Sequence, residues 1–280
     1  MNKIYIIAEI GINHNGDMKL AKELIGRSAQ AGADAVKFQK RTIKLVYTPE
    51  ELDKYRESPW GTTNREQKEG LEFDIEQYKE LQSFANNLNL DFIVSCWDMD
   101  SVDLVEQHLN VRYHKIASAL ATNKEFLQKL NETKKPVILS TGMCSEEQIE
   151  AAVDILGDSV EYVLACTSTY PTMADEVNLR HMVTLKNNYP HCKIGFSNHY
   201  NGHDACVGAA VLDAECIEFH VTKDRTMYGS DQSASIERED LVRLVKETRK
   251  VTNTMGTGQK FFLQHERPVA TKLRYFEVVG

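Results

Sequence analysis

Residues 136–166 read PVILSTGMCSEEQIEAAVDILGDSVEYVLAC, and this stretch decides the fold. Two short apolar runs, 136–141 and 161–166, flank a segment at 145–156 whose apolar residues recur at helical spacing. Ser145 stands at the start of that segment, in the position of a helix N-cap. A nearly continuous hydrophobic strand is typical of a parallel sheet that is covered on both faces. The stretch therefore predicts a strand, a covering helix and a second, parallel strand.

The same alternation runs along most of the 280-residue chain. Further strand-like runs occur at 5–10, 34–39, 91–96, 112–118, 193–197 and 216–220. Further helical patterns occur at 17–31, 76–89, 100–109, 123–132, 178–188, 202–213 and 237–254, with Asp17 and Asn123 as candidate N-caps. Eight strand–helix units in roughly 250 residues predict an α/β fold of the (β/α)8 TIM barrel type. An open, doubly wound sheet uses the same alternation and is the alternative.

The expected domain organisation is simple. We expect one catalytic barrel at 1–256 and a short C-terminal tail at 257–280, with no second domain. The connection at 40–75 is much longer than the others, which is typical of a functional loop. It leaves the C-terminal end of a strand, so we expect it to overhang the active face of the barrel.

Charge and cysteine content bound the class of protein. The chain has 33 Lys and Arg against 41 Asp and Glu, a formal net charge of −8, which argues against non-specific nucleic-acid binding. Its six cysteines form no CxxC pair, which is typical of reduced thiols. No apolar run approaches the ~18 residues that span a bilayer, and the N-terminus lacks a signal-peptide pattern. We expect a cytoplasmic protein that binds neither nucleic acid nor membrane.

Polar residues stand at the C-terminal ends of the predicted strands, where barrels place their catalytic groups. They are Glu9, Lys37, Gln39, Ser95, Lys115, Ser118, Ser140, the segment CTSTYPT (166–172), the segment SNH (197–199) and His220. A lysine inside an apolar strand is costly unless it faces a ligand or a carboxylate. Lys37 and Lys115 among hydroxyls suit a bound phosphate or carboxylate. Pairing with a barrel carboxylate such as Glu9 is the alternative.

Two histidines end neighbouring strands of the predicted barrel. His199 and His220 would lie close enough to share one divalent metal ion, with water or a carboxylate completing an open site. Two satisfied structural histidines are the alternative. His14 and His203 are weaker candidates.

Seven segments together resemble the sialic acid synthase family, whose members condense phosphoenolpyruvate with an N-acetylated hexose to make nonulosonic acids. The segments are AEIGINHNGD (8–17), AGADAVKFQ (31–39), KIAS (115–118), ILSTGM (138–143), CTSTYPT (166–172), GFSNH (195–199) and EFHVTKDRTMYGSDQSAS (218–235). They occur in order along most of the chain and fall on the predicted strand ends. The resemblance implies a phosphoenolpyruvate-condensing transferase (EC 2.5.1) that acts as a homodimer on phosphoenolpyruvate and an amino sugar.

The resemblance also assigns roles to residues. It implies that His199 and His220 hold a divalent metal, usually Mn²⁺ in the family, with Mg²⁺ or Co²⁺ as alternatives. Phosphoenolpyruvate contacts fall on Lys37, Ser95, Lys115, Ser118, Ser140, Ser168 and Ser197. Sugar contacts fall on Gln39, Tyr170 and Asp231, and Glu9 matches a catalytic carboxylate.

The chain departs from the family pattern on the sugar side. Leu120 stands where relatives often carry a glutamate that touches the sugar, and the chain stops near where relatives begin a small antifreeze-like domain. We therefore expect a broadened or shifted range of acceptors. Two rival functions use the same phosphate cradle: a metal-dependent aldolase or 3-deoxy-ulosonate synthase, and a barrel that binds sugar phosphates without catalysis.

Overall fold

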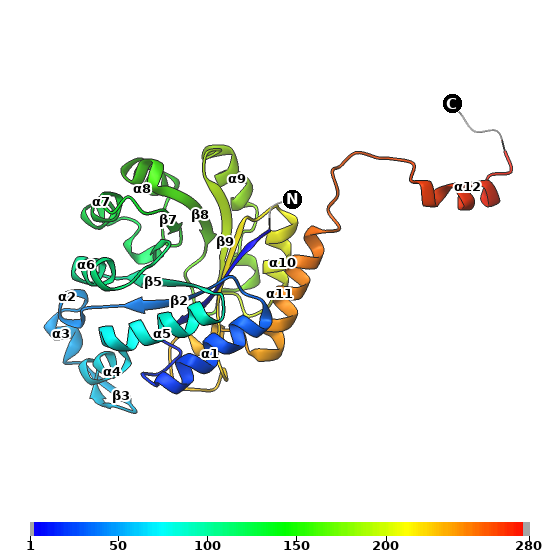
Figure 1. Cartoon of the computed structure of the whole chain (residues 1–280). Helices are drawn as coiled ribbons and strands as arrows, with labels where there is room; N and C mark the ends of the chain where they lie inside the picture. Colours follow the sequence, from blue (N-terminus) through cyan, green and yellow to red (C-terminus); the bar gives the residue numbers. More distant parts are fainter. Residues whose placement is uncertain (1–2, 277–280) are drawn as a thin grey trace.

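The computed structural model describes residues 3–276, and a closed barrel of eight parallel strands forms its centre (Figure 1). The barrel strands are β1 (Tyr5–Gly11), β2 (Ala35–Lys40), β5 (Asp91–Cys96), β6 (His114–Ile116), β7 (Val137–Ser140), β8 (Val160–Cys166), β9 (Lys193–Asn198) and β10 (Cys216–His220). Strand β1 pairs with β2 on one side and with β10 on the other, which closes the sheet. The prediction of a TIM barrel is therefore confirmed, and the open doubly wound sheet is excluded.

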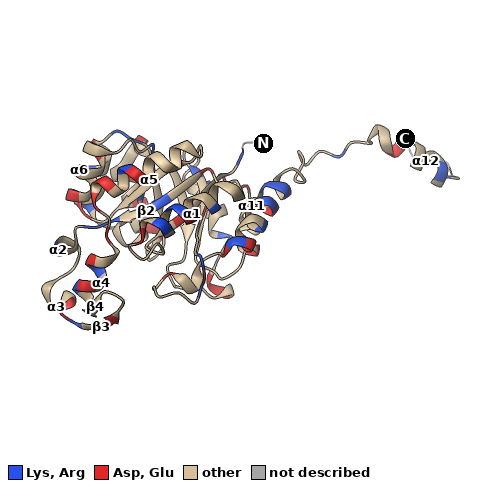
Figure 2. Ribbon diagram, turned by 60° about the horizontal axis from the view of Figure 1, so that its bottom comes forward, with Lys and Arg blue, Asp and Glu red and all other residues tan. Residues whose placement is uncertain are grey.

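Helices cover the outside of the barrel between the strands. They are α1 (Met18–Ala31), α5 (Ile75–Asn87), α6 (Met99–His108), α7 (Lys124–Glu132), α8 (Glu146–Leu156), α9 (His181–Asn188), α10 (Asp204–Val211) and α11 (Arg238–Thr252). The predicted N-caps Asp17, Asn123 and Ser145 are confirmed, because each side chain accepts a backbone N–H at the start of its helix. Acidic and basic residues lie together on the outer helices, as Figure 2 shows for α1, α5, α6 and α11.

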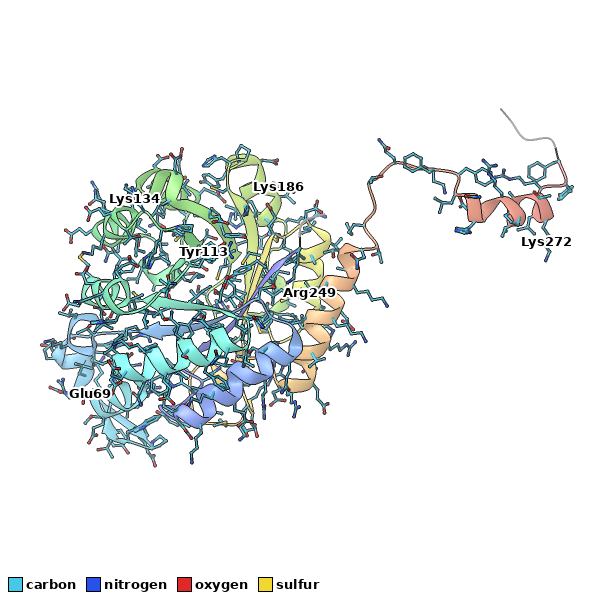
Figure 3. The ribbon with its side chains drawn as sticks, viewed as in Figure 1. Glu69, Tyr113, Lys134, Lys186, Arg249 and Lys272 are labelled. Atoms are coloured by element: carbon cyan, nitrogen blue, oxygen red, sulfur yellow. The ribbon has the colours of Figure 1, made fainter. Side chains whose placement is uncertain are left out.

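The interior of the barrel has an apolar floor and a polar upper layer, because side chains on a strand alternate between its two faces. The floor is a buried cluster of Ile7, Ala35, Ile93, Tyr113, Ile138, Tyr162, Leu164 and Cys216. Tyr113 is labelled inside the body of the molecule in Figure 3. Two positions further along the same strands stand Glu9, Lys37, Ser95, Lys115, Ser140, Cys166 and Glu218. The strand period therefore places one polar layer at the C-terminal ends of the strands, above a dry floor.

The long connection after β2 is folded. It contains helix α2 (Ile43–Val46), helix α3 (Pro49–Leu52), a hairpin of β3 (Tyr55–Ser58) and β4 (Gly61–Thr63), and helix α4 (Asn64–Leu71). We call residues 41–73 the β2 insertion. It contacts the loop after β10, where Arg56 Nε donates to Tyr228 Oη at 3.3 Å and the rings of Trp60 and Tyr228 lie 5.9 Å apart. The two loops therefore support each other.

The chain after α11 leaves the barrel and ends in helix α12 (Arg267–Leu273), which lies apart from the body of the molecule (Figure 1). Phe261, Phe262, Leu263 and Leu273 are more than half exposed there. Lys272, labelled in Figure 3, shows how far this tail lies from the barrel. The predicted tail extends to residue 280, and its residues 277–280 lie outside the described part. Among residues 3–276, none of the helices combines the length and the apolar character needed to cross a bilayer.

Candidate active site

Two adjoining cavities open at the C-terminal ends of the strands. The inner chamber, about 180 Å³, is lined by strand residues that include Glu9, Lys37, Lys115, His199 and His220. The outer chamber, about 220 Å³, lies against the β2 insertion and the loop after β10. Gln39, Trp97 and Tyr170 line both chambers and form the boundary between them. As expected, the long connection overhangs the site.

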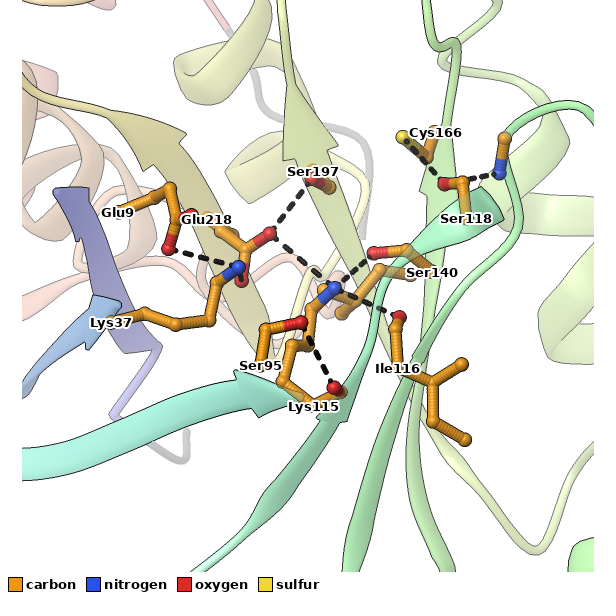
Figure 4. Close-up of polar contacts among 12 residues, drawn as sticks. Glu9, Lys37, Ser95, Lys115, Ile116, Ser118, Ser140, Cys166, Ser197 and Glu218 are labelled. Carbon is orange, nitrogen blue, oxygen red and sulfur yellow. Dashed lines mark hydrogen bonds and ion pairs between the residues drawn. The ribbon is translucent and has the colours of Figure 1, made fainter. Parts of the chain in front are cut away.

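The inner chamber holds a buried network of two lysines and two carboxylates (Figure 4). Lys37 Nζ lies 2.9 Å from Glu9 Oε2 and 3.7 Å from Glu218 Oε2. Lys115 Nζ lies 3.5 Å from Glu218 Oε1. The lysines therefore do pair with barrel carboxylates, as the alternative interpretation had it, and this pairing does not exclude a bound anion. Glu218 was not among the predicted residues, although it is a charged residue in an apolar strand on the same face as His220.

The two lysines of this network differ in how far the nearby carboxylates offset the effect of burial on their pKa. Burial raises the pKa of Glu218, but Lys115 and Lys37 outweigh burial and hold that pKa at about 2, so the carboxylate is ionised. Burial lowers the pKa of Lys37, but Glu218 and Glu9 more than offset it and the pKa lies above its usual value. For Lys115 burial dominates, and repulsion from Lys37 adds to it, so its pKa is lowered despite Glu218. Lys115 is therefore the lysine that gains most from an anionic ligand.

The predicted serines surround this network. Ser140 Oγ accepts from Lys115 Nζ at 2.6 Å, and Ser197 Oγ donates to Glu218 Oε1 at 3.1 Å. Ser95 Oγ donates to the Lys115 carbonyl oxygen at 3.1 Å, so it fixes the lysine backbone. Each of these hydroxyls is buried and lines the inner chamber.

A glycine brings the remaining two serines to the chamber wall. The backbone N–H of Gly142 donates to Ser118 Oγ at 3.0 Å. A Cβ at this glycine would lie 2.1 Å from Ser168 Oγ and 2.8 Å from Ser118 Oγ, so only glycine fits without moving them. Gly142 was also missed from the sequence. Its signal was a glycine directly after a polar strand end, in the segment STG.

His199 and His220 lie side by side, with ring centroids 5.5 Å apart. His199 Nδ1 donates to the Thr167 carbonyl oxygen at 2.7 Å, so the lone pair of the neutral ring is on Nε2. Tyr170 Oη lies 3.1 Å from this Nε2. A carbonyl partner on the second ring nitrogen is typical of histidines that bind a metal.

His220 is the less satisfied of the two. Its buried Nδ1 has no hydrogen-bond partner among the described residues, and Asp231 Oδ2 lies 3.8 Å away. Burial lowers the pKa of His220, so the ring is neutral, which is the form that binds metals. These observations fit a divalent metal and disfavour two satisfied structural histidines. Within residues 3–276 no group of three or more His, Cys, Asp or Glu side chains is placed to hold a metal.

The residues predicted to contact a sugar lie at the outer chamber. Gln39 and Tyr170 line both chambers, and Asp231 lines the outer one. Gln39 Nε2 donates to Glu9 Oε1 at 2.7 Å, and its Oε1 accepts from the Arg41 guanidinium. Gln39 therefore connects the catalytic carboxylate candidate with the outer wall.

Two other residues are placed differently from what the sequence suggested. Leu120 packs against the hydrophobic core, and its neighbours Ser118 and Ala119 line the inner chamber instead. The expectation that Leu120 faces the sugar is therefore wrong. His14 is a structural residue: it stacks on Phe73 with centroids 4.2 Å apart, and burial lowers its pKa to about 3.

Known proteins resemble this chain in both sequence and fold. A model of the NeuB family matches residues 24–260. The chain is 36% identical over 274 residues to the N-acetylneuraminate-9-phosphate synthase of Mus musculus, which covers 96% of this chain and 76% of that protein. It is 38% identical over 272 residues to the N,N'-diacetyllegionaminic acid synthase of Campylobacter jejuni, with coverage of 93% and 80%. Its fold resembles the N-acetylneuraminic acid (sialic acid) synthetase of Leptospira borgpetersenii, crystallised with citrate: the TM-score is 0.85, the identity 30%, and the coverage 98% and 94%.

Proposed function

Because the chain belongs to the NeuB family of sialic acid synthases, we propose that it condenses phosphoenolpyruvate with an N-acetylated hexose to a nonulosonic acid and phosphate. The observation that carries the proposal is the inner chamber, where two buried lysines and five serines lie beside two histidines. A chamber of this kind suits a small, multiply charged anion.

The residues of the inner chamber divide the binding of phosphoenolpyruvate between them. Lys115 is the undercompensated cation and would take the phosphate, together with the hydroxyls of Ser118, Ser140 and Ser168. Lys37 is the better compensated lysine and would take the carboxylate. Because these groups are fixed by strands above an apolar floor, they hold the enol without reorganisation.

His199 and His220 would hold Mn²⁺, with Mg²⁺ or Co²⁺ as alternatives. The ring nitrogens that would bind it are His199 Nε2, which lies 3.1 Å from Tyr170 Oη, and His220 Nδ1, which has no partner among the described residues. When bound, the ion supplies Lewis-acid polarisation of the acceptor aldehyde and offsets the carboxylates of Glu9 and Glu218.

The reaction joins carbon 3 of phosphoenolpyruvate to the aldehyde carbon, and water then adds at carbon 2. The bond between carbon 2 and the bridging oxygen breaks, and phosphate leaves. Glu9 is the group placed to accept the proton of that water, since Gln39 and Lys37 hold its two oxygens at 2.7 and 2.9 Å. The acceptor chain would lie along Gln39, Tyr170 and Asp231.

Finer features belong to the same proposal. The enzyme is a transferase of class EC 2.5.1, it acts in the cytoplasm as a homodimer, and its catalytic unit is the barrel at 1–256. Six free cysteines support a reducing compartment. The exposed apolar residues of the tail, such as Phe261 and Leu263, support a second copy as a partner. Sedimentation of the purified chain tests the dimer.

The names of the relatives leave the acceptor open. The three carbons of phosphoenolpyruvate become carbons 1 to 3 of the product, so carbon 6 of a hexose becomes carbon 9. The mouse relative is named for a 9-phosphate product, and the Campylobacter relative is not.

A test needs the purified chain, Mn²⁺, phosphoenolpyruvate and a panel of aldoses. We expect phosphate release that depends on an N-acetylated hexose, with a product of the mass of a nonulosonic acid. Release with unsubstituted aldose phosphates alone would indicate a 3-deoxy-ulosonate synthase instead. Phosphoenolpyruvate binding without turnover on any acceptor would indicate a binding protein.

A further inference from the structure

Three cations at the outer chamber lack a carboxylate partner. Arg41 and Lys68 line the chamber, and Arg56 lies close enough to perturb Lys68. Among residues 3–276, none of the three makes an ion pair with an acidic side chain. This differs from the inner chamber, where Glu9 and Glu218 form ion pairs with the two lysines. In a chain of net charge −8, an unneutralised group of cations calls for a local reason.

The carboxylates of the outer chamber are already engaged. Glu72 Oε2 lies 2.8 Å from Lys40 Nζ and accepts the backbone N–H of Arg41 at 3.2 Å. Asp231 accepts from Ser230 Oγ at 2.7 Å and faces His220 at 3.8 Å. Neither carboxylate forms an ion pair with Arg41 or Lys68 among residues 3–276, and Asp231 offsets the charge of Lys68 only in part.

Arg41 lies against the Trp97 ring and keeps a guanidinium donor without a partner among the described residues. Arg41 is only 8% exposed, and its guanidinium carbon lies 4.0 Å from the centre of the Trp97 ring. One guanidinium nitrogen donates to Gln39 Oε1, but Nε is buried without a partner. A buried donor without a partner is costly, and a planar guanidinium fixed on a ring is well suited to an oxyanion.

Lys68, in the same insertion, is a second partly buried cation without an acidic partner in the described part of the chain. It projects from α4, and its Nζ lies 5.0 Å from the centre of the Tyr47 ring. Burial, together with Arg56 and Arg41, lowers the pKa of Lys68 to about 8, against smaller opposing effects of Asp231 and Glu51. An anion bound between Arg41 and Lys68 would pair with both charges and reduce the repulsion between them.

We propose that the outer chamber binds a phosphate monoester on the acceptor sugar, at the end of the sugar remote from its aldehyde. The aldehyde belongs at Glu9 and the two histidines, on the inner side of the boundary formed by Gln39 and Tyr170. Arg41 and Lys68 line only the outer side, so they meet the far end of the hexose, carbon 6. Several cations around one group suit a dianion better than a single carboxylate. This inference rests on the proposed function and names its acceptor class.

The test compares three acceptors with phosphoenolpyruvate and Mn²⁺: N-acetylmannosamine, its 6-phosphate and its 6-carboxylate. We expect kcat/KM to be higher for the 6-phosphate by about 100-fold or more, as for two charge-assisted contacts. Lys68→Met should reduce the ratio of kcat/KM values, 6-phosphate over unphosphorylated sugar, by about 10- to 100-fold. Lys44→Met, an exposed lysine on α2 of the same insertion, is the matched control and should leave the ratio unchanged.

A binding measurement separates this inference from the proposed function. Calorimetric titration of the 6-phosphate without phosphoenolpyruvate should show binding that Lys68→Met weakens, whether or not condensation follows. If no acceptor gives product but this binding persists, the proposed function fails and the anion site stands. Equal kcat/KM for the sugar and its 6-phosphate, preference for the 6-carboxylate, or binding indifferent to Lys68→Met would each overturn the inference.

Discussion

The inner and outer chambers adjoin, but they are built in different ways. The inner chamber is made by strand ends above an apolar floor, and its two lysines form ion pairs within the protein with Glu9 and Glu218. The outer chamber is made by the β2 insertion and the loop after β10, and its cations are left without carboxylates. Internal neutralisation holds charged groups in place before substrate arrives. In our proposal the inner chamber is therefore organised for one reaction, whereas the outer chamber is completed by its ligand and selects the acceptor.

The largest expected effect lies in the inner chamber, at the histidines. His220→Ala should lower metal-dependent phosphate release by about 1,000-fold or more, because Lewis-acid polarisation is worth several kcal/mol. His181→Ala, which removes a partly buried histidine paired with Glu146 on the outside of the barrel, is the control and should keep full activity. Thermal unfolding should show both variants folded. Full activity of His220→Ala after treatment with a chelator would remove the metal from the inner chamber.

The next effect separates binding from catalysis in the same chamber. Lys115→Met removes the undercompensated cation and should weaken phosphoenolpyruvate binding by roughly 30- to 1,000-fold, or about 2–4 kcal/mol. Calorimetric titration measures this directly. Lys193→Met, which removes a half-exposed lysine paired with Glu161 outside the chamber, should bind as the parent does. Unchanged affinity in Lys115→Met would show that this lysine serves only the ion-pair network.

A smaller effect is expected from pH at the outer chamber. Lys68 binds an anion in its protonated form, and the pKa of the free lysine is lowered to about 8 by burial. The value of kcat/KM for a 6-phosphorylated acceptor should therefore fall by about 10-fold as pH rises through about 8. The acceptor phosphate is already a dianion at that pH, so it adds no change of its own. A pH profile that keeps this limb in Lys68→Met would assign it to another group.

The smallest effect is expected at Leu120. Because its side chain packs on the core, Leu120→Glu should change acceptor selectivity by less than about twofold, and its cost should appear in stability, at roughly 1–3 kcal/mol. Kinetics with the acceptor panel and a thermal melt measure the two quantities. A selectivity that moves toward unphosphorylated sugar in Leu120→Glu would mean that the acceptor reaches beyond the outer chamber.

The same contrast explains which parts of the site could be predicted from the sequence. In a strand the alternation of side chains fixes their direction, so the sequence alone places Lys37, Lys115 and His220 on the interior face, with His199 directly after the end of its strand. Glu218 obeys the same rule, two positions before His220 and between Ile217 and Phe219. It could have been found by applying the alternation to charges as well as to histidines.

The remaining residues lie where no simple period applies. Leu120 ends the 3-10 turn η1 (Ser118–Leu120), in which successive side chains rotate by about 120°, so Ala119 faces the chamber and Leu120 faces the core. Arg41 and Lys68 belong to the β2 insertion, whose short helices and hairpin are set by contacts with the loop after β10. The sequence predicts that this insertion overhangs the site but not which of its cations meet there.

The central claim is that the inner chamber breaks the bond between carbon 2 and the bridging oxygen of phosphoenolpyruvate during condensation. Phosphoenolpyruvate labelled with oxygen-18 at the bridging position tests it most directly, with the acceptor panel and mass analysis of both products. We predict that the label leaves with the released phosphate and that release requires an N-acetylated hexose. A label retained in the carbon product, or heavy phosphate released at the same rate without acceptor, would contradict the account.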